Sequence, residues 1–255
     1  MVRALTAVVY IIIFLIGASF FSFFNVVIYR VPRKLDFVKG RSLCPACGHN
    51  LKGSDMIPML SWLLSGGKCR YCKARISVRY ALVELFGGLL AIGCIMNYGD
   101  RLQALVVFAF FSILTVIAIV DMDTMEIPNG FVIGLLTVSA VSIVVFPDIR
   151  FMQRVIGMAA VSLPLLIIAM LVPGAFGGGD IKLMAASGLF LGWKLNLIAL
   201  FLAIISGGGY GIYLLAAKKK GRKEHFAFGP FLCVGMAVSF LWGERLFCWY
   251  LNLFF

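Results

Sequence analysis

The stretch ALTAVVYIIIFLIGASFFSFFNVVIY, residues 4–29, decides the fold class of this chain. It runs for 26 residues without a charged side chain, and a helix needs roughly 20 apolar residues to cross a bilayer. It is longer than the roughly 7–15-residue apolar region of a signal peptide, and no small-residue cleavage site ends it. We therefore expect residues 4–29 to form a first membrane helix that is not removed.

The remainder of the chain has the same apolar character. Hydrophobic residues make up 62% of the sequence and the mean hydropathy is +1.02, whereas soluble domains are about 45–50% apolar. A long run is divided at GWK, residues 192–194, because it exceeds one span. The sequence thus predicts an all-α polytopic membrane protein with about eight transmembrane helices, near residues 4–29, 80–98, 102–120, 127–147, 155–172, 181–191, 195–217 and 226–242. The apolar tail, residues 246–255, is too short to span and is expected at the membrane interface.

Positive charge is concentrated beside these apolar runs. Residues 30–79 hold 11 Lys and Arg side chains against two aspartates, and a second basic block covers residues 218–223. Basic loops favour the cytoplasmic side, and six crossings between the two blocks place both there. Nucleic-acid binding is the other common use of basic patches, but their position beside membrane spans argues against it. We expect an outward N-terminus and a cytoplasmic loop over residues 31–79.

Four cysteines of this loop form two C-x-x-C pairs. The two-residue spacing lets a tight turn present two thiolates to one ion, and four thiolates complete a closed, structural zinc site. A reducing cytoplasm disfavours disulfides here. We therefore predict a small zinc-ribbon-like loop that holds structural Zn²⁺, with four reduced and unligated cysteines as the alternative. The ligands are Cys44, Cys47, Cys69 and Cys72, whereas Cys94, Cys233 and Cys248 lie in apolar runs and are expected to be buried.

Two aspartates stand at the edges of uncharged runs. Asp121 opens DMDTME, residues 121–126, and Asp180 closes GGGD, residues 177–180. Ionisable groups at membrane depth cost roughly 2.5–3.5 kcal/mol each and are functional candidates. The predicted spans put both at the cytoplasmic boundary, where two close carboxyls would share one proton and activate a water molecule. Gly177 and Gly179 would let a backbone approach closely. Ordinary interfacial carboxylates, or a proton pathway, are the alternatives.

The order of these motifs resembles that of the bifunctional type IV prepilin leader peptidases/N-methyltransferases, which are GxGD-type intramembrane aspartic proteases. The resemblance runs from about residue 40 to residue 230. It rests on several independent motifs: the two cysteine pairs, DMIP (55–58), SW (61–62), RY (79–80) with Glu84, DMDTMEIPN (121–129), GGGDIK (177–182) and FGP (228–230).

This resemblance implies an endopeptidase whose catalytic pair is Asp121 and Asp180, with Asp123 as a nearby competitor for the first position. It implies pilin-like precursors as substrates, each with a basic leader that is cut after a glycine on the cytoplasmic side. It also implies methylation of the new amine with S-adenosyl-L-methionine as methyl donor. Glu84 is a candidate for leader binding or methyl transfer, or else a paired helix residue, and no motif identifies the methyl-donor site.

Three parts follow from these expectations. Residues 1–30 are the first transmembrane helix, residues 31–79 the cytoplasmic zinc-binding loop, and residues 80–255 a seven-helix membrane protease core. The bacterial cytoplasmic (inner) membrane is the expected location, with prepilin and pseudopilin precursors and the lipid bilayer as partners and no nucleic acid. A proton-coupled transporter and a non-enzymatic zinc-loop assembly protein remain as alternatives.

Overall fold

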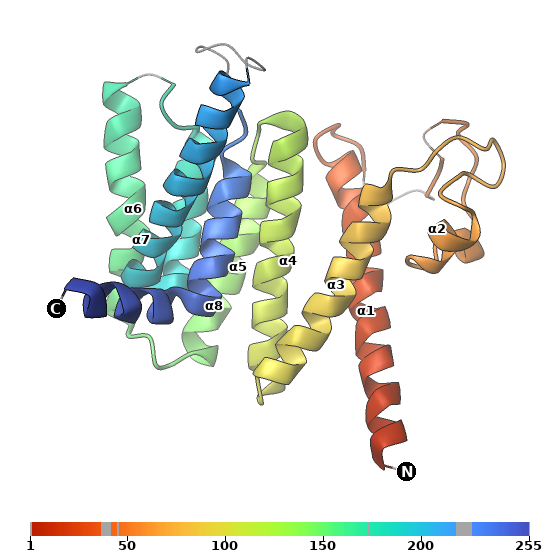
Figure 1. Cartoon of the computed structure of the whole chain (residues 1–255), viewed down its shortest axis with the longest axis horizontal. Coiled ribbons are helices and arrows are strands. Elements are labelled where there is room, and N and C mark those ends of the chain that lie inside the picture. Colours follow the sequence, from red (N-terminus) through yellow and green to blue (C-terminus); the bar gives the residue numbers. More distant parts are fainter. Residues whose placement is uncertain (1, 37–41, 45, 173, 218–225, 255) are drawn as a thin grey trace. The chain divides into compact units, whose positions relative to one another are not determined.

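The computed structural model describes residues 2–36, 42–44, 46–172, 174–217 and 226–254, and over these residues it is helical without an extended strand (Figure 1). Six helices are long and apolar enough to cross a membrane, and α5 is a shorter apolar helix of 17 residues. The all-α, multi-pass fold predicted from the sequence is thereby confirmed. The elements are α1 (Val2–Arg30), η1 (Gly53–Asp55), α2 (Leu60–Leu64), α3 (Val78–Asn97), α4 (Arg101–Thr124), α5 (Asn129–Val145), α6 (Phe151–Leu171), α7 (Gly178–Ala216) and α8 (Gly229–Phe254).

The chain forms two compact units, one up to Phe108 and one from Ala109 onward. The first contains α1, the cysteine-rich lobe with η1 and α2, and α3, while the second contains α5 to α8; α4 begins in the first unit and ends in the second. The sequence-based division at residues 30 and 79 separates parts of the chain by their expected roles and not by how they pack. It stays a prediction. The basic block at residues 218–223 lies outside the described residues.

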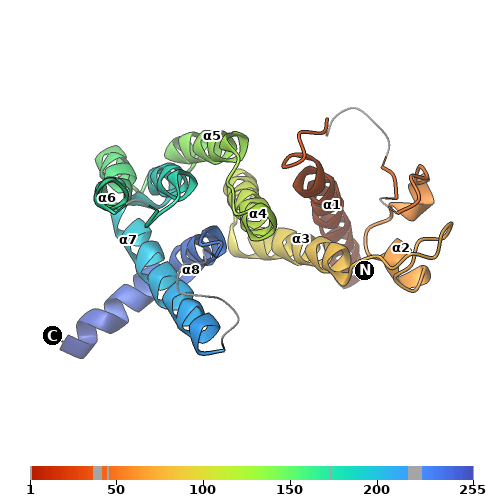
Figure 2. The same ribbon diagram turned by 90° about the horizontal axis from the view of Figure 1, so that it is seen from above.

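In the first unit, α1 packs closely against α3 (Figure 1, Figure 2). Glycines allow this approach: a Cβ on Gly17 would stand 2.5 Å from the carbonyl oxygen of Gly87. Nearer the lobe, Asn25 of α1 donates from Nδ2 to the carbonyl of Tyr80, 3.2 Å away, and Asn25 is buried. Small residues that permit close backbone contact are typical of helix pairs in membranes.

In the second unit, α7 reverses direction at Gly192. The backbone there has φ 74° and ψ 173°, a conformation that essentially only glycine adopts. Asn196 donates from Nδ2 to the carbonyl of Met184, 3.0 Å away, although twelve residues of continuous helix would separate them by about 18 Å. The two halves, residues 178–191 and 193–216, therefore lie antiparallel. This confirms the division at residues 192–194 and yields the eight apolar helical segments that the sequence predicts.

The first half of α7 packs against α6 through a pair of glycines. A Cβ on Gly157 would lie 2.5 Å from the carbonyl oxygen of Gly188, and a Cβ on Gly188 would clash with the backbone of Gly157. The second half packs similarly on α8, where a Cβ on Gly235 would collide with the backbone of Ala199. At these glycines the paired helices meet backbone to backbone, with no room for a side chain.

The last helix departs from the sequence-based expectation. We predict an end near residue 242, but α8 continues to Phe254, and its final turns run in a different direction from its beginning (Figure 1). No proline or glycine follows Gly243 to end the helix. Cys94 and Cys233 are buried as predicted, whereas Cys248 is exposed. That prediction for Cys248 was wrong because it lies on the extended part of α8.

Candidate active site and metal site

Asp121 lies in the last turn of α4 and is 5% exposed. Its Oδ2 accepts the backbone N–H of Gly229 at 2.9 Å. Gly229 is the first residue of α8, so its N–H has no partner within that helix, and a carboxylate is a favourable acceptor at a helix N-terminus. A Cβ on Gly229 would stand 2.7 Å from this same oxygen. The glycine of FGP is therefore the residue type that lets the two helix ends meet.

Asp180 is the third residue of α7 and is 9% exposed. Its Oδ2 accepts the N–H of Gly177, the residue that precedes the helix, at 3.3 Å. A carboxylate that reaches back from the third helical position in this way stabilises the helix start. One residue earlier, a Cβ on Gly179 would lie 3.0 Å from the Cβ of Ile127. The GGGD motif and the loop after DMDTME are thus in contact.

Two contacts bring the aspartates into one region: the residue before Asp180 lies against Ile127, just after α4, and Asp121 accepts the N–H of Gly229. Cys233, one turn into α8, is buried as well. The end of α4 and the starts of α7 and α8 therefore converge, and each contributes to one buried polar region. That Asp121 and Asp180 form the catalytic pair stays a prediction from the sequence.

Asp123 is placed differently from Asp121. It is exposed, as expected for a residue two positions further along a helix, where side chains point to another face. The helix ends directly afterwards at Thr124, and Met125 has a positive φ of 56°. This geometry supports the preference for Asp121 as the buried member of the pair.

Side chains from α5 and from the second half of α7 hold the half helix that carries Asp180. Ser139 of α5 donates from Oγ to the carbonyl of Ala186 at 2.9 Å. Asn196, from the second half of α7, donates to the carbonyl of Met184. Both polar side chains are completely buried. These bonds use carbonyls of the half helix as extra acceptors, which fixes its position in a region without water.

Arg154, in the first turn of α6, is also completely buried. Its Nη1 donates to the carbonyl of Leu189 at 2.9 Å and to that of Phe190 at 3.3 Å, at the end of the half helix. Its Nη2 donates to the carbonyls of Ser142 at 3.1 Å and Phe146 at 2.8 Å, at the end of α5. Carbonyls in a last helical turn lack partners, and a cation is favourable there. One guanidinium thus caps two helices.

The arginine was not singled out from the sequence, where it reads as one of several polar residues in a break between spans. No carboxylate pairs with Arg154 among the residues that the structure describes. Arg154 lies at the end of the half helix that is opposite to Asp180. Sequence spacing could not predict this position, because the carbonyls that accept its hydrogen bonds come from α5 and α7. A charged residue in the first turn of an apolar helix is the only signal that the sequence offered.

In the first unit, the two cysteine pairs lie in two turns of the same shape. The N–H of Gly48 donates to the carbonyl of Cys44 at 2.8 Å, and the N–H of Lys73 donates to that of Cys69 at 3.0 Å. Gly48 has φ 67° and Lys73 has φ 62°, so a lysine occupies in the second turn the left-handed position that a glycine occupies in the first. Antiparallel bridges close both turns, at Leu43 with Asn50 and at Lys68 with Arg75.

The four Sγ atoms of Cys44, Cys47, Cys69 and Cys72 lie within 4.8 Å of one another, and those of Cys44 and Cys72 are 3.9 Å apart. Tetrahedral zinc with Zn–S bonds of about 2.3 Å requires S–S separations of about 3.8 Å. Backbone N–H groups at Cys72 and Tyr71 lower the pKa of the Cys69 thiol to about 7, which favours the thiolate form that binds metals. The cluster can hold a metal ion.

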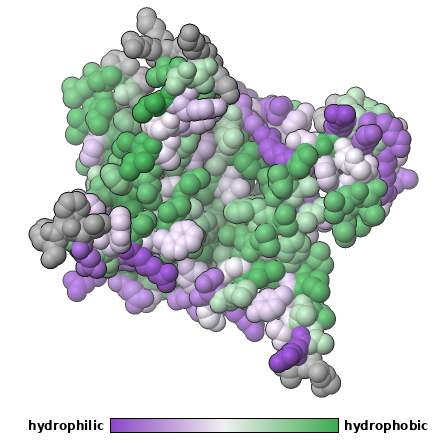
Figure 3. Space-filling view, viewed as in Figure 1, coloured by the Kyte–Doolittle hydropathy of each residue, from purple (hydrophilic) through white to green (hydrophobic). Residues whose placement is uncertain are grey.

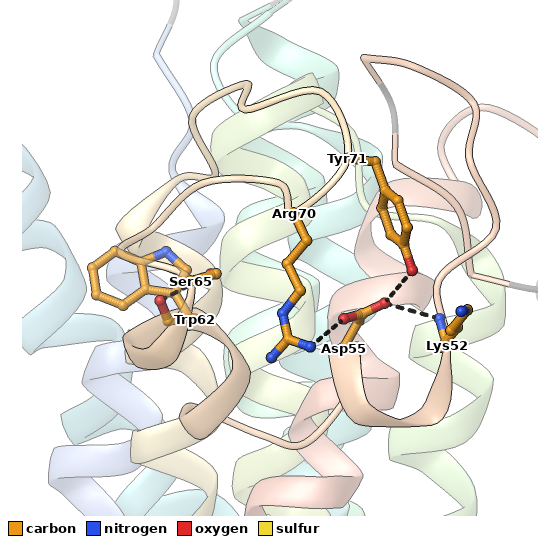
Figure 4. Close-up of polar contacts among 6 residues, drawn as sticks. All are labelled: Lys52, Asp55, Trp62, Ser65, Arg70 and Tyr71. Carbon is orange, nitrogen blue, oxygen red and sulfur yellow. Dashed lines mark hydrogen bonds and ion pairs between the residues drawn. The ribbon is translucent and has the colours of Figure 1, made fainter.

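Asp55 connects the second cysteine turn to the segment between the pairs (Figure 4). Its Oδ2 accepts the N–H of Lys52 at 3.1 Å and the hydroxyl of Tyr71 at 3.2 Å, and its Oδ1 pairs with Arg70 at 3.2 Å. Arg70 and Tyr71 are the two residues between Cys69 and Cys72. The carboxylate of the DMIP motif therefore supports the turn that presents two of the four thiols.

Glu84, in the second turn of α3, accepts the N–H of Met59 with its Oε2 at 2.7 Å. Met59 precedes α2 and has φ 59° and ψ −45°, an uncommon conformation for a residue with a side chain. The contact makes Glu84 an anchor between the lobe and α3. Roles in leader binding or methyl transfer stay predictions.

These features define an all-helical, multi-pass membrane protein with a four-cysteine lobe in one unit and two buried, converging aspartates in the other. Residues 15–98 match the bacterial peptidase A24 N-terminal domain, and residues 108–212 match the type IV leader peptidase family.

Two similar proteins are each named prepilin leader peptidase/N-methyltransferase. That of Bacillus subtilis (strain 168) is 31% identical over 242 residues, which cover 95% of this chain and 98% of the relative. That of Aeromonas hydrophila is 31% identical over 272 residues, which cover 95% and 94%. The chain therefore belongs to the type IV leader peptidase family. No solved structure matches it.

Proposed function

We propose that the protein is a membrane-embedded aspartic endopeptidase that removes the leader from type IV prepilin-like precursors and then methylates the new N-terminal amine. The observation that carries the peptidase activity is the convergence of Asp121 and Asp180, both buried, from the two motifs that contain them. Membership of the type IV leader peptidase family, and relatives named for both activities, support the same reaction.

The chemistry follows from two carboxyl groups that share one proton. The ionised carboxylate takes a proton from a water molecule, and the water oxygen attacks the carbonyl carbon of the scissile bond. The protonated carboxyl donates its proton to the carbonyl oxygen. When the tetrahedral intermediate collapses, the carbon–nitrogen bond breaks and the leaving nitrogen takes the proton that the first carboxylate removed from water. The proton on the former carbonyl oxygen returns to the second carboxylate. Gly177 to Gly179 offer an approach to Asp180 without side chains in front of it.

The membrane arrangement fits a precursor whose apolar helix lies in the bilayer. Positive charge beside the spans supports a cytoplasmic position for the ends that carry Asp121 and Asp180, in the bacterial inner membrane. The precursor would present its leader junction on that side. The cut would then be made at the membrane boundary, where water is available for hydrolysis.

The methyl-transfer reaction requires S-adenosyl-L-methionine, which supplies an electrophilic methyl group to the uncharged amine. We assign the cysteine lobe a structural Zn²⁺ held by Cys44, Cys47, Cys69 and Cys72, since the sulfur spacing fits a tetrahedral site. Four thiolates leave no open position, so the metal would stabilise the lobe and not act on substrate. Metal analysis of the purified protein should give one zinc, and should give none after all four cysteines are replaced by serine.

The test of the peptidase is co-expression with a precursor, followed by the mobility shift of the product and mass measurement of its N-terminus. Asp121→Asn and Asp180→Asn should each lower cleavage by about 10²–10⁴-fold, with normal membrane insertion, whereas Asp123→Asn should still cleave. The mature product should carry one added methyl group.

Intact cleavage by either buried-aspartate variant would contradict the assignment of that residue. A transporter would be favoured instead if both variants cleaved normally but abolished a proton-dependent flux. An assembly protein would be favoured if both cleaved normally and only the cysteine variants lost function.

A further inference from the structure

The short helix α2 exposes a row of leucines on the surface of the cysteine-rich lobe. Leu60, Leu63 and Leu64 are 51%, 60% and 77% exposed, and lie at positions i, i+3 and i+4 on one helix face. We call these three residues the leucine stripe. Directly before it, Met56 and Ile57 are also exposed. Apolar side chains gathered on one surface indicate an interaction site.

The opposite face of α2 is fixed to the lobe, so the stripe cannot turn inward. The indole Nε1 of Trp62 donates to the carbonyl of Ile76 at 3.2 Å. The indole ring also packs against Gly67, where a Cβ would stand 2.9 Å from the ring. Because the aromatic residue holds the inner face, the leucine stripe points away from the lobe.

The depth of the stripe follows from its attachment to α3. Met59, directly before α2, donates its N–H to Glu84, which lies six residues inside a helix that can span the membrane, Val78–Asn97. Six residues of helix rise about 9 Å. The 20 residues of this helix correspond to the roughly 30 Å of a hydrocarbon core. The start of α2 therefore lies beside the second turn of α3, within the length of a helix that can span the membrane.

The charges around the stripe indicate what it contacts. Exposed basic residues cover the lobe, whereas Asp55, an acid between the cysteine pairs, is paired with Arg70. Figure 3 shows hydrophilic residues on the upper and outer parts of this lobe and hydrophobic residues on its lower side. An apolar face on a lobe whose other exposed side chains are largely cationic matches an anionic lipid surface. The exposed basic residues are Lys52, Lys68, Arg70, Lys73, Arg75 and Arg79.

We propose that residues 56–64 dip into the cytoplasmic leaflet, with the leucine stripe among acyl chains and the surrounding lysines and arginines at anionic headgroups. Val78 and Leu82 at the start of α3 are exposed as well, so both the lobe and this helix offer apolar side chains to lipid. The membrane is favoured over the precursor as the occupant because, under the proposed function, the precursor leader is basic like the lobe. The inference otherwise stands apart from that function.

The test is photo-crosslinking of the whole protein in nanodiscs that contain phosphatidylglycerol, with a diazirine-bearing amino acid in place of Leu64. The matched control carries the same amino acid in place of Ala46, an exposed residue of the first cysteine turn. We expect at least tenfold more lipid adduct from position 64. Equal yields at the two positions, or an adduct with an added precursor in place of lipid, would overturn the proposal.

Two further measurements address charge and folding. In phosphatidylcholine nanodiscs the lipid adduct from position 64 should fall severalfold, and an unchanged yield would refute the part played by the basic residues. With the photoreactive group at position 60, Leu63→Ser combined with Leu64→Ser should lower the lipid adduct severalfold at an unchanged melting temperature. Unchanged capture in this variant would overturn the insertion of the stripe. Precursor cleavage is not the readout, so these outcomes are separate from the failure of the peptidase assignment.

Discussion

The backbone N–H of Gly229 donates to Oδ2 of Asp121 at 2.9 Å, across 108 positions of sequence. The bond joins the end of α4 to the start of α8 and orients a carboxylate that is otherwise removed from water. A buried acceptor without this partner would carry an unsatisfied desolvation penalty of about 1–3 kcal/mol. Orientation of Asp121 and stability of the α4–α8 contact are therefore coupled.

Gly229→Ala should separate the two helix ends. The new Cβ would stand 2.7 Å from Oδ2 of Asp121, so either the carboxylate or α8 has to move. A displacement on the order of 1 Å can lower turnover about 100-fold. We expect a fall of this size in kcat for precursor cleavage. Gly208→Ala is the control, since nothing lies within 4 Å of its Cβ position, and it should cleave like the wild type. Wild-type turnover in the Gly229 variant would show that the contact has no role in orienting Asp121.

Gly178 and Gly179 provide a matched pair of substitutions. A Cβ on Gly179 would lie 3.0 Å from Ile127, whereas nothing lies within 4 Å of a Cβ on Gly178. Gly179→Ala should therefore lower cleavage about tenfold or more by displacing Asp180, and Gly178→Ala should be tolerated. Because the nearest atom is the Cβ of Ile127, Ile127→Gly, which removes that atom, should restore part of the activity to the Gly179 variant. Equal activity of the two alanine variants would contradict this prediction.

Arg154→Met should destabilise the second unit. The substitution leaves buried carbonyls at the ends of α5 and of the first half of α7 without their charged donor, and hydrogen bonds to charged groups contribute about 1.5–3 kcal/mol each. We expect the free energy of unfolding to fall by about 3 kcal/mol or more, measured in detergent.

Arg154→Lys is the companion variant, because it keeps the charge but offers fewer donors in a fixed geometry. It should lie between the wild type and the methionine variant in stability. If the arginine also positions Asp180, kcat per folded molecule should fall in the lysine variant while KM changes little. A lysine variant with wild-type kcat would limit Arg154 to a structural role.

Lys73→Gly tests the likeness of the two cysteine turns. Lys73 has the same left-handed backbone as Gly48, and such a conformation costs a residue with a side chain roughly 1–2 kcal/mol. Glycine at position 73 should therefore keep or raise resistance of the bound metal to a chelator, and Gly48→Lys should lower it. The measurement is the chelator concentration that releases half of the zinc. The reverse order of the two variants would contradict the equivalence of the turns.

The sequence predicted the spans because membrane insertion depends on local hydrophobicity, which a single stretch carries by itself. It also predicted the reversal near residue 192, since Gly192 interrupts a run too long for one span. The end of α8 was misjudged because the tail is apolar and carries no terminating residue. Whether the helix continues past residue 242 depends on packing with neighbouring segments, and hydropathy carries no information about that packing.

Residues of the site could be predicted from the sequence only where they belong to a recognisable motif. Asp121 and Asp180 follow from costly acids at the edges of apolar runs. The bond from Gly229 could not be predicted in the same way, because it joins segments distant in sequence. Glu84 was identified as a candidate, but its bond to Met59 depends on the path of the lobe. Likewise, the capping by Arg154 depends on the reversal of α7, which brings Leu189 within reach.

The buried guanidinium of Arg154 has a consequence for how a substrate can enter. Sliding or tilting the half helix that carries Asp180 would strip a cation of its ligands inside an apolar medium, which makes that segment the stationary side of the enzyme. Asp121 lies on α4 instead, and is joined to the beginning of α8 by the main-chain N–H of Gly229. Opening for a precursor is therefore expected there, with Asp121 and α8 parting while Asp180 keeps its place.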